Sequence, residues 1–155
     1  MKIRRFQERD AEAVAELLAV TLRTTNIKDY SSEEIENQVK THQPQNILEW
    51  ASWTHFYVVC DGEKIVGSGA IGPYWGKTDE SSFFTIFVLP EYQGKGIGRK
   101  IIQTLEQDAF FLRAKRIEIP ASITAVPFYR KMGYGYKNGI SAPDSEGLVR
   151  LEKFR

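Results

Sequence analysis

A short stretch of glycines and basic residues is the part of this chain whose residue types and spacing are best suited to chemistry. It reads Gln93-Gly94-Lys95-Gly96-Ile97-Gly98-Arg99-Lys100 and stands between an apolar run and an amphipathic run. Glycines let a backbone approach an anion closely, and the first amides of a helix lack partners and carry the positive end of the helix dipole. Lys95, Arg99 and Lys100 add formal positive charge. The stretch therefore predicts a site for a phosphate or pyrophosphate.

A tight turn without a ligand would use the same glycines, and on the residues alone this alternative stays open. Two familiar nucleotide-binding motifs do not fit. The dinucleotide motif G-x-G-x-x-G opens a βαβ unit, whereas Gly94, Gly96 and Gly98 are spaced differently and lie in mid-chain. The P-loop motif G-x-x-x-x-G-K-[ST] does not occur in the sequence.

The elements on either side must position this stretch. The run Phe83–Leu89 is apolar at nearly every position, which predicts a strand buried on both faces near the centre of a sheet. After the glycines, apolar residues at helical spacing predict a helix from Ile97 to about Arg113, with a buried face of Ile97, Ile101, Leu105, Ala109 and Leu112. The local order is therefore strand, turn, helix.

The first half of the chain divides into helices followed by a hairpin. Asp10 is placed to cap a helix that runs to about residue 23. Ser31 and Glu34 form a capping box, flanked by Tyr30 and Ile35 as a hydrophobic staple, for a helix that ends near His42 because Pro44 cannot continue it. The other expected elements are a strand at 2–6, one helical turn at 46–53, and strands at 54–60 and 63–74 joined by the turn Asp61-Gly62.

The second half alternates strands with helices. The expected elements are a strand at 116–120, a short helix at 122–132, and strands at 134–140 and 148–154. The whole order is β-α-α-β-β-β-α-β-α-β-β. Because hairpins and α crossovers both occur, the sequence predicts an α/β (α+β) fold with a mixed sheet flanked by helices.

Composition narrows the class of protein. The chain has 155 residues, which we expect to form a single domain over 1–155, and its net charge of +1 gives no field that would attract nucleic acid or a membrane. It lacks an apolar run of membrane-spanning length and an N-terminal signal core. The single cysteine, Cys60, fits a reducing cytoplasm and is better read as a small buried hydrophobe than as a nucleophile. His42 and His55 stand alone, so no metal site is expected, and His42 ends a helix, where a cation is favourable.

Two blocks of sequence resemble the GNAT family of N-acetyltransferases. Gln93, Gly96 and Gly98, preceded by V-x-P-E-x, resemble the coenzyme A pyrophosphate loop of that family. A second block resembles the family pattern A-S-x-x-A-x-x-F-Y-x-x-x-G-[FY], through Ala121, Ser122, Ala125, Phe128, Tyr129, Gly133 and Tyr134. The order of elements also resembles the GNAT fold over essentially the whole chain. Pro120 departs from the pattern, since many relatives carry a polar residue near this point.

Read as residues alone, the second block is a short helix. Ser122 can cap it, Ala125 and Phe128 face the core, and Gly133 supplies a left-handed exit. Tyr129 points to another face, where without the resemblance it would be a half-buried aromatic with its hydroxyl in water.

The resemblance implies roles for particular residues. Tyr129 would donate a proton to the departing thiolate, and Glu80 would be the base that deprotonates the amine, directly or through water, although a solvated strand-end carboxylate is the alternative reading of Glu80. The Val88 amide would polarise the thioester carbonyl. The residues expected to bind acetyl-CoA are Phe87, Val88, Leu89, Gln93, Gly94, Lys95, Gly96, Ile97, Gly98, Arg99, Ser122 and Phe128.

The function that follows is an acetyl-CoA-dependent N-acetyltransferase that moves the acetyl group directly to a primary amine of a small molecule or a protein. A non-catalytic coenzyme A or acyl-CoA sensor is the alternative. The acceptor is not readable from the sequence, because four aromatics could line its pocket or belong to the core and rim: Trp50, Trp53, Tyr74 and Trp75. A homodimer through the last strands is compatible with the sequence, which does not decide it.

Overall fold

A computed structural model describes all residues from 1 to 155 and shows a seven-stranded mixed sheet. The strand order is β1-β2-β3-β4-β5-β7-β6, and only β4 and β5 run parallel. The bounds are β1 (Lys2–Arg5), β2 (His55–Asp61), β3 (Lys64–Pro73), β4 (Glu80–Val88), β5 (Arg116–Ser122), β6 (Gly135–Tyr136) and β7 (Leu148–Phe154). The predicted mixed sheet, with β4 at its centre, is confirmed.

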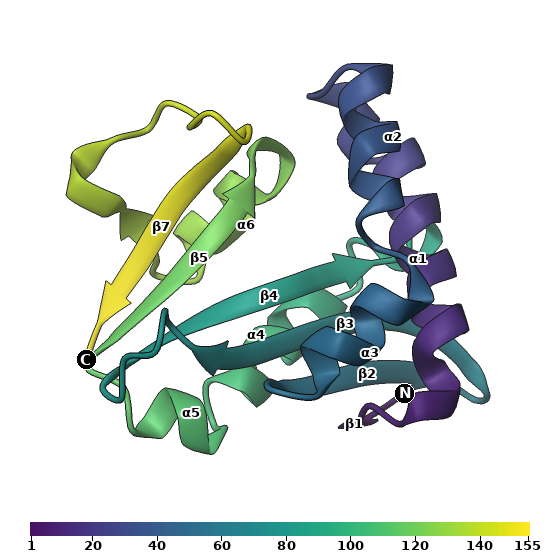
Figure 1. The fold of residues 1–155 in the computed structure, drawn as a ribbon, viewed down its shortest axis with the longest axis horizontal. Helices are drawn as coiled ribbons and strands as arrows, with labels where there is room; N and C mark the ends of the chain where they lie inside the picture. The colour runs from purple at the N-terminus through teal and green to yellow at the C-terminus, as the bar shows by residue number, and fades with distance from the viewer.

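The sheet opens between its two central strands. β4 and β5 pair only at their starts, where Glu80, Ser81 and Ser82 lie beside Arg116, Ile117 and Glu118. Beyond that point the strands diverge, as Figure 1 shows, and β5 continues with β7 while β4 continues with β3. The sheet therefore has two halves joined at one end and open at the other.

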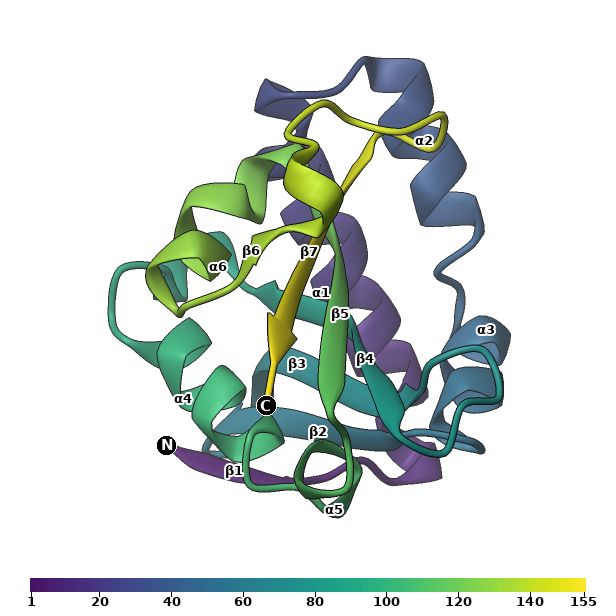
Figure 2. The same cartoon turned by 90° about the vertical axis from the view of Figure 1, so that its left-hand side faces the viewer.

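Helices cover both faces of the sheet. They are α1 (Ala11–Thr24), α2 (Ser32–Lys40), α3 (Pro44–Ala51), α4 (Ile97–Leu105), α5 (Ala109–Leu112) and α6 (Val126–Lys131). Ile101 of α4 packs on Gly69 of β3, whereas Trp53, just after α3, packs on Gly72 of the same strand. Residues 69 and 72 point to opposite faces because side chains alternate along a strand. Figure 2 shows α4 and α6 on one side of the sheet and α2 and α3 on the other.

The predicted start of α2 is confirmed, and that of α1 is corrected. The Ser31 hydroxyl accepts from the Glu34 amide, and the Glu34 carboxylate accepts from the Ser31 amide. Asp10 precedes α1 but does not cap it. Its carboxylate instead accepts two hydrogen bonds from Arg4, at 2.8 and 3.0 Å, and one from the Gln7 amide. A buried carboxylate beside a guanidinium is better satisfied there than at the helix amides.

The single helix predicted from Ile97 to about Arg113 is wrong, because α4 ends at Leu105 and α5 begins at Ala109. Asp108 lies between the two helices. Its carboxylate accepts from the Phe110 amide at 2.8 Å, as an N-cap does, and from Tyr57 Oη of β2 at 2.6 Å. Burial, followed by this bond to Asp108, raises the pKa of Tyr57 to about 12. The apolar spacing alone did not predict this break, because it carries no information about the hydrogen bond between Asp108 and Tyr57 of β2.

Three other expectations are adjusted. β4 is buried at Ser81–Phe83, but its second half, Phe84–Val88, is only partly buried because β5 has moved away. The strand expected at 134–140 contains only the two residues of β6, followed by a short 3-10 turn at Lys137–Gly139. The helix expected at 122–132 begins as a 3-10 turn and becomes α6 only at Val126.

None of the helices has both the length and the apolar character needed to cross a lipid bilayer.

Candidate active site

A large cleft lies where β4 and β5 diverge. Its volume is about 950 Å³, and its walls come from β4, β5, the glycine-rich loop, α6 and the α1–α3 region. Most of the predicted site residues line it: Phe87, Val88, Gln93, Gly94, Gly96, Ile97, Gly98, Arg99, Ser122, Phe128 and Tyr129. The structure thus brings together two blocks that are separated in the sequence by α4, α5 and β5.

The loop that leads into α4 has the backbone shape of an anion cradle. Gly94 and Gly96 adopt φ values of +76° and +81°, in the left-handed region that favours glycine. No backbone acceptor in the protein is found for the amides of Gly94, Lys95 and Gly96, and the next amides open a helix, where i−4 partners are lacking. Arg99 adds charge to this wall of the cleft, whereas the Lys95 ammonium lies over the Tyr92 ring, 5.3 Å from its centroid.

The open edge of β4 exposes the peptide groups of Val88. The Leu89 amide donates to the Val66 carbonyl of β3 at 2.9 Å, so the peptide groups of the preceding residue point to the opposite edge. The Val88 carbonyl is indeed free of β3 and accepts from Gln93 Nε2 at 3.0 Å. The expectation for Leu89 is corrected, because this buried residue does not line the cleft and its amide is already bonded.

A bulge in β4 contributes to the divergence. Two residues of β4, Thr85 and Ile86, stand opposite the single Gly69 of β3, and Thr85 has a φ of +49°. The Ser68 hydroxyl of β3 donates to the Thr85 carbonyl at 2.7 Å and holds the bulge. Bulges bend a strand and increase its twist, so this one turns the end of β4 away from β5.

Tyr129 is a buried residue that lines the cleft. It is 4% exposed, whereas its neighbour Phe128 is only partly buried, so the expected burial of these two aromatics is reversed. The Tyr129 hydroxyl has no hydrogen-bond partner in the protein, yet it is not sealed off from the cleft that the residue lines. Burial raises the pKa of Tyr129, so its phenol stays protonated at neutral pH. Ser122 lines the same region but, contrary to expectation, its side chain caps no helix.

Comparison with known proteins decides the family. The sequence model of the Acetyltransferase (GNAT) family matches residues 20–134. The chain belongs to the GNAT family. A curated relative, the uncharacterized N-acetyltransferase YjcF of Bacillus subtilis, is 35% identical over 92 residues, which are 58% of this chain and 62% of YjcF. The match therefore spans less than two thirds of that relative.

Solved structures agree on the fold. The PaiA N-acetyltransferase of Thermoplasma acidophilum, in complex with coenzyme A, superposes with a TM-score of 0.84 at 18% identity, over 99% of this chain and 98% of the other. A GCN5-related N-acetyltransferase of Rhodopseudomonas palustris gives 0.80 at 21% identity, over 99% and 95% of the two chains. At such identities the likeness establishes the GNAT fold.

Glu80 lies apart from the cleft of this GNAT domain. It begins β4 at the joined end of the two half-sheets, and its carboxylate accepts from Arg116 Nη1 at 2.9 Å. It does not line the cleft with Tyr129. The structure therefore does not bring this candidate base to the place where the other candidate residues meet.

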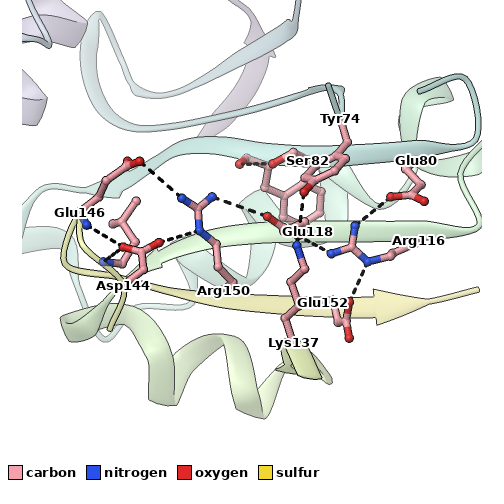
Figure 3. A network of polar contacts seen from close by, with 12 residues as sticks. Tyr74, Glu80, Ser82, Arg116, Glu118, Lys137, Asp144, Glu146, Arg150 and Glu152 are labelled. Atoms are coloured by element: carbon pink, nitrogen blue, oxygen red, sulfur yellow. Dashed lines mark hydrogen bonds and ion pairs between the residues drawn. The ribbon is translucent and has the colours of Figure 1, made fainter. Parts of the chain in front are cut away.

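Glu118 is the centre of a charged network around the same joined end (Figure 3). It is 1% exposed and binds Lys137 at 2.8 Å and Arg116, with Arg150 at 3.6 Å. Burial alone would raise the pKa of Glu118, but the hydrogen bonds and charges of Lys137 and Arg116 outweigh burial and hold it below the ordinary value. Arg116 also binds Glu152 of β7 at 2.7 Å. The network ties β4, β5 and β7 together where the cleft is closed.

His42 is a residue of the site that was not predicted from the sequence. His42 lines the cleft on the α1–α3 side, with Trp50 and Trp53. Burial lowers the pKa of His42, more than its bond to the Gln38 carbonyl raises it, so the cation expected at this helix end is corrected to a neutral imidazole. Of the other two candidate aromatics, Tyr74 contacts Lys137 and Trp75 is 83% exposed, and neither lines the cleft. His42 belongs to no sequence motif, and it lines the cleft only because α2, which it follows, packs on that side.

Proposed function

We propose that this chain is an acetyl-CoA-dependent N-acetyltransferase that transfers the acetyl group directly to a primary amine of a small molecule or a protein. One observation carries the proposal. A single cleft is lined by the anion-cradle loop at residues 93–99, the open peptide edge at Val88 and the unpartnered hydroxyl of Tyr129. Acetyl-CoA is an extended thioester with a diphosphate at its far end, so it needs an anion site, a strand edge for its arm and a proton donor for its sulfur.

The loop and the strand edge divide the binding of the coenzyme. The free amides of Gly94–Gly98 and the charge of Arg99 suit the pyrophosphate. The pantetheine arm, which carries amides, suits the β4 edge at Val88 in the way an added strand pairs with an open sheet. Coenzyme A is bound in the solved structures of the Thermoplasma acidophilum protein and of Rv2747 from Mycobacterium tuberculosis, which supports this assignment.

The chemistry is shared by two groups of the cleft. The Val88 amide points to the open edge and would donate to the thioester carbonyl as negative charge develops on its oxygen. Tyr129, protonated at neutral pH, would give its proton to the sulfur as the C–S bond breaks. Cys60 is buried in β2 and does not line the cleft, so direct transfer without an acylated enzyme fits this structure.

Thermal unfolding with coenzyme A and acetyl-CoA is the first test. Ligand that binds the folded state raises the midpoint, by an amount equivalent to about 2.7 kcal/mol at 100 times the dissociation constant. A panel of primary amines and amino-terminal or lysine peptides is then tested for thiol release, with the product read by mass.

Stabilisation together with an acetylated product supports the proposal. Stabilisation without transfer to any amine, unchanged in Tyr129→Phe, supports a coenzyme sensor instead. Absence of stabilisation contradicts both functions.

A further inference from the structure

Five aromatic side chains form a wall on the α1–α3 side of the cleft, which we call the aromatic wall: His42, Trp50, Trp53, Phe84 and Phe87. They form two groups of contacting rings, one of Trp50, His42 and Phe87 and one of Trp53 and Phe84. The His42 ring lies 5.1 Å from Trp50 and 6.3 Å from Phe87, and Trp53 lies 5.3 Å from Phe84. Such a surface suits the apolar body of an amine and attracts its ammonium group through the ring faces.

The aromatic wall and the anion-cradle loop reach the cleft from opposite faces of the sheet. α4, which follows the loop, packs on the face of Gly69, whereas Trp53 packs on the face of Gly72. The Phe87 ring packs with α1 and α2 residues, and the next residue is Val88, whose peptide groups face the gap. The His42 ring therefore contacts Phe87, the residue that precedes Val88, at whose open peptide edge the thioester is expected.

Hydrogen bonding fixes the tautomer of His42. Nδ1 lies 2.6 Å from the Gln38 carbonyl, which can only accept, so Nδ1 carries the proton. In a neutral imidazole Nε2 then keeps its lone pair. Nε2 has no hydrogen-bond partner in the protein and is not among the fully buried polar atoms, so it is accessible from the cleft. His42 thus presents an uncharged nitrogen base at the wall of the cleft.

The surroundings of His42 keep it neutral. The groups that contact it are the Gln38 carbonyl of α2, the Thr41 hydroxyl in the turn after α2, and the rings of Trp50 from α3 and Phe87 from β4, none of which is charged. Burial lowers the pKa of His42, and no carboxylate opposes that effect. A base with a pKa below the assay pH is ready to take a proton.

Few other groups of the cleft could accept a proton. Among its lining residues the charged side chains are Arg99, Lys131 and Glu146. Glu146 is 70% exposed and stands 4.0 Å from Arg150. Glu80 is held by Arg116 outside the cleft. His42 and Glu146 are therefore the two candidates that an experiment must separate.

We propose that Nε2 of His42 accepts the proton that an acceptor ammonium must lose before its nitrogen attacks the thioester, a role that rests on the proposed function. An aliphatic ammonium has a pKa of about 10.4, so at neutral pH almost all of it is protonated and unreactive. The acceptor enters along the aromatic wall, and its class is an amine with an apolar or aromatic body.

The protons balance with two groups of the protein. The ammonium gives one proton to His42 Nε2, which later releases it to solvent. The nitrogen forms the C–N bond as the C–S bond breaks, and the sulfur takes the proton of Tyr129. The second proton lost by the nitrogen restores the Tyr129 phenol. The sum is one amide, one thiol and one proton released, without any oxidation or reduction.

The first test is independent of turnover. The chain has two histidines, so nitrogen NMR of labelled protein, with His55→Gln to assign the signals, reports the tautomer of His42. We expect Nδ1 protonated and Nε2 bare at neutral pH. A cationic His42 at that pH, or a neutral ring protonated on Nε2, overturns the proposal.

The second test compares amines that are protonated at neutral pH with amines that are not. His42→Gln should lose about 100-fold in kcat/KM with alkylamines, the lower range for general base catalysis, and much less with arylamines, which are already uncharged. It should also lose the acidic limb of the pH profile, while coenzyme A still raises its unfolding midpoint. His55→Gln, outside the cleft, should keep that limb.

The outcomes separate the two proposals. Turnover that falls equally with both amine classes, or an acidic limb lost in Glu146→Gln but kept in His42→Gln, overturns the role of His42 alone. Failure of the wild-type protein to acetylate any amine, despite binding coenzyme A, overturns the proposed function and this role together. His42→Asn, a second variant without a basic nitrogen, should repeat the result if His42→Gln folds poorly.

Discussion

The Phe128 ring lies directly against Gly98, so that a Cβ added at residue 98 would stand 3.1 Å from Phe128 Cζ. Gly98 belongs to the first turn of α4 and Phe128 to α6. This contact joins the two halves of the candidate site across the opening of the sheet. The glycine is needed here for close packing, whereas Gly94 and Gly96 are needed for backbone conformation, since a Cβ on either would meet nothing within 4 Å.

Gly98→Ala should weaken coenzyme binding because the Phe128 ring must shift across the pyrophosphate loop. An overpacking cost of about 1 kcal/mol, at the low end for such insertions, corresponds to about a fivefold rise in the dissociation constant. Calorimetry with coenzyme A measures it. Adding Phe128→Leu should restore part of the affinity, and an equal loss with and without that second change would contradict a clash between the two side chains.

Tyr129→Phe should lower kcat about 100-fold, as expected for loss of a general acid, with little change in the KM for acetyl-CoA. Tyr134→Phe is the matched control, because Tyr134 is also buried but donates to Glu106 at 2.9 Å and does not line the cleft. It should lose about 1 kcal/mol of unfolding free energy while keeping kcat. Thiol-release kinetics and urea unfolding measure the two effects, and a normal kcat in Tyr129→Phe would remove the residue from the mechanism.

Glu80→Gln should leave the acidic limb of the kcat/KM profile unchanged, because the Glu80 carboxylate is bound to Arg116 outside the cleft. Its effect should instead be a loss of about 1 kcal/mol in unfolding free energy, as for a partly buried hydrogen bond. Turnover as a function of pH, together with urea unfolding, distinguishes the two. An abolished acidic limb with normal stability would show that Glu80 reaches the acceptor, directly or through water.

Glu118→Gln should destabilise the fold by about 3 kcal/mol, because it leaves buried cationic partners without their carboxylate. The pKa of Glu118 is lower in the folded chain than its ordinary value of 4.5, so the unfolded chain binds the proton more readily. Its contribution is therefore present above pH 4.5 and is lost as the pH falls through the folded pKa.

Urea unfolding across the acidic range measures this dependence. The slope of stability against pH below the ordinary pKa should be smaller in Glu118→Gln than in the wild type. Glu36→Gln, which breaks the exposed pair with Arg23, should change little. Equal slopes in wild type and Glu118→Gln would contradict the stabilising role of the network.

Local signals in the sequence predicted much of the fold. The capping box at Ser31, the hairpin turn at Asp61-Gly62 and the left-handed exit at Gly133 all form as expected, because each depends on residues a few positions apart. The break between α4 and α5 was missed because Asp108 is satisfied by Tyr57 of β2, a partner distant in the sequence. The spacing of apolar residues shows which face of a helix is buried, but it does not show which distant group will form a hydrogen bond with a polar residue.

Two short motifs were enough to recognise the family, the loop at Gln93–Arg99 and the block around Tyr129, because such motifs encode backbone shape and local packing. The tertiary structure alone decided which polar groups meet in the cleft. It placed Glu80 with Arg116 at the joined end of the half-sheets and brought His42, unmarked by any motif, to the open end. Proton-transfer roles depend on proximity and burial, and these arise only when segments far apart in the chain pack together.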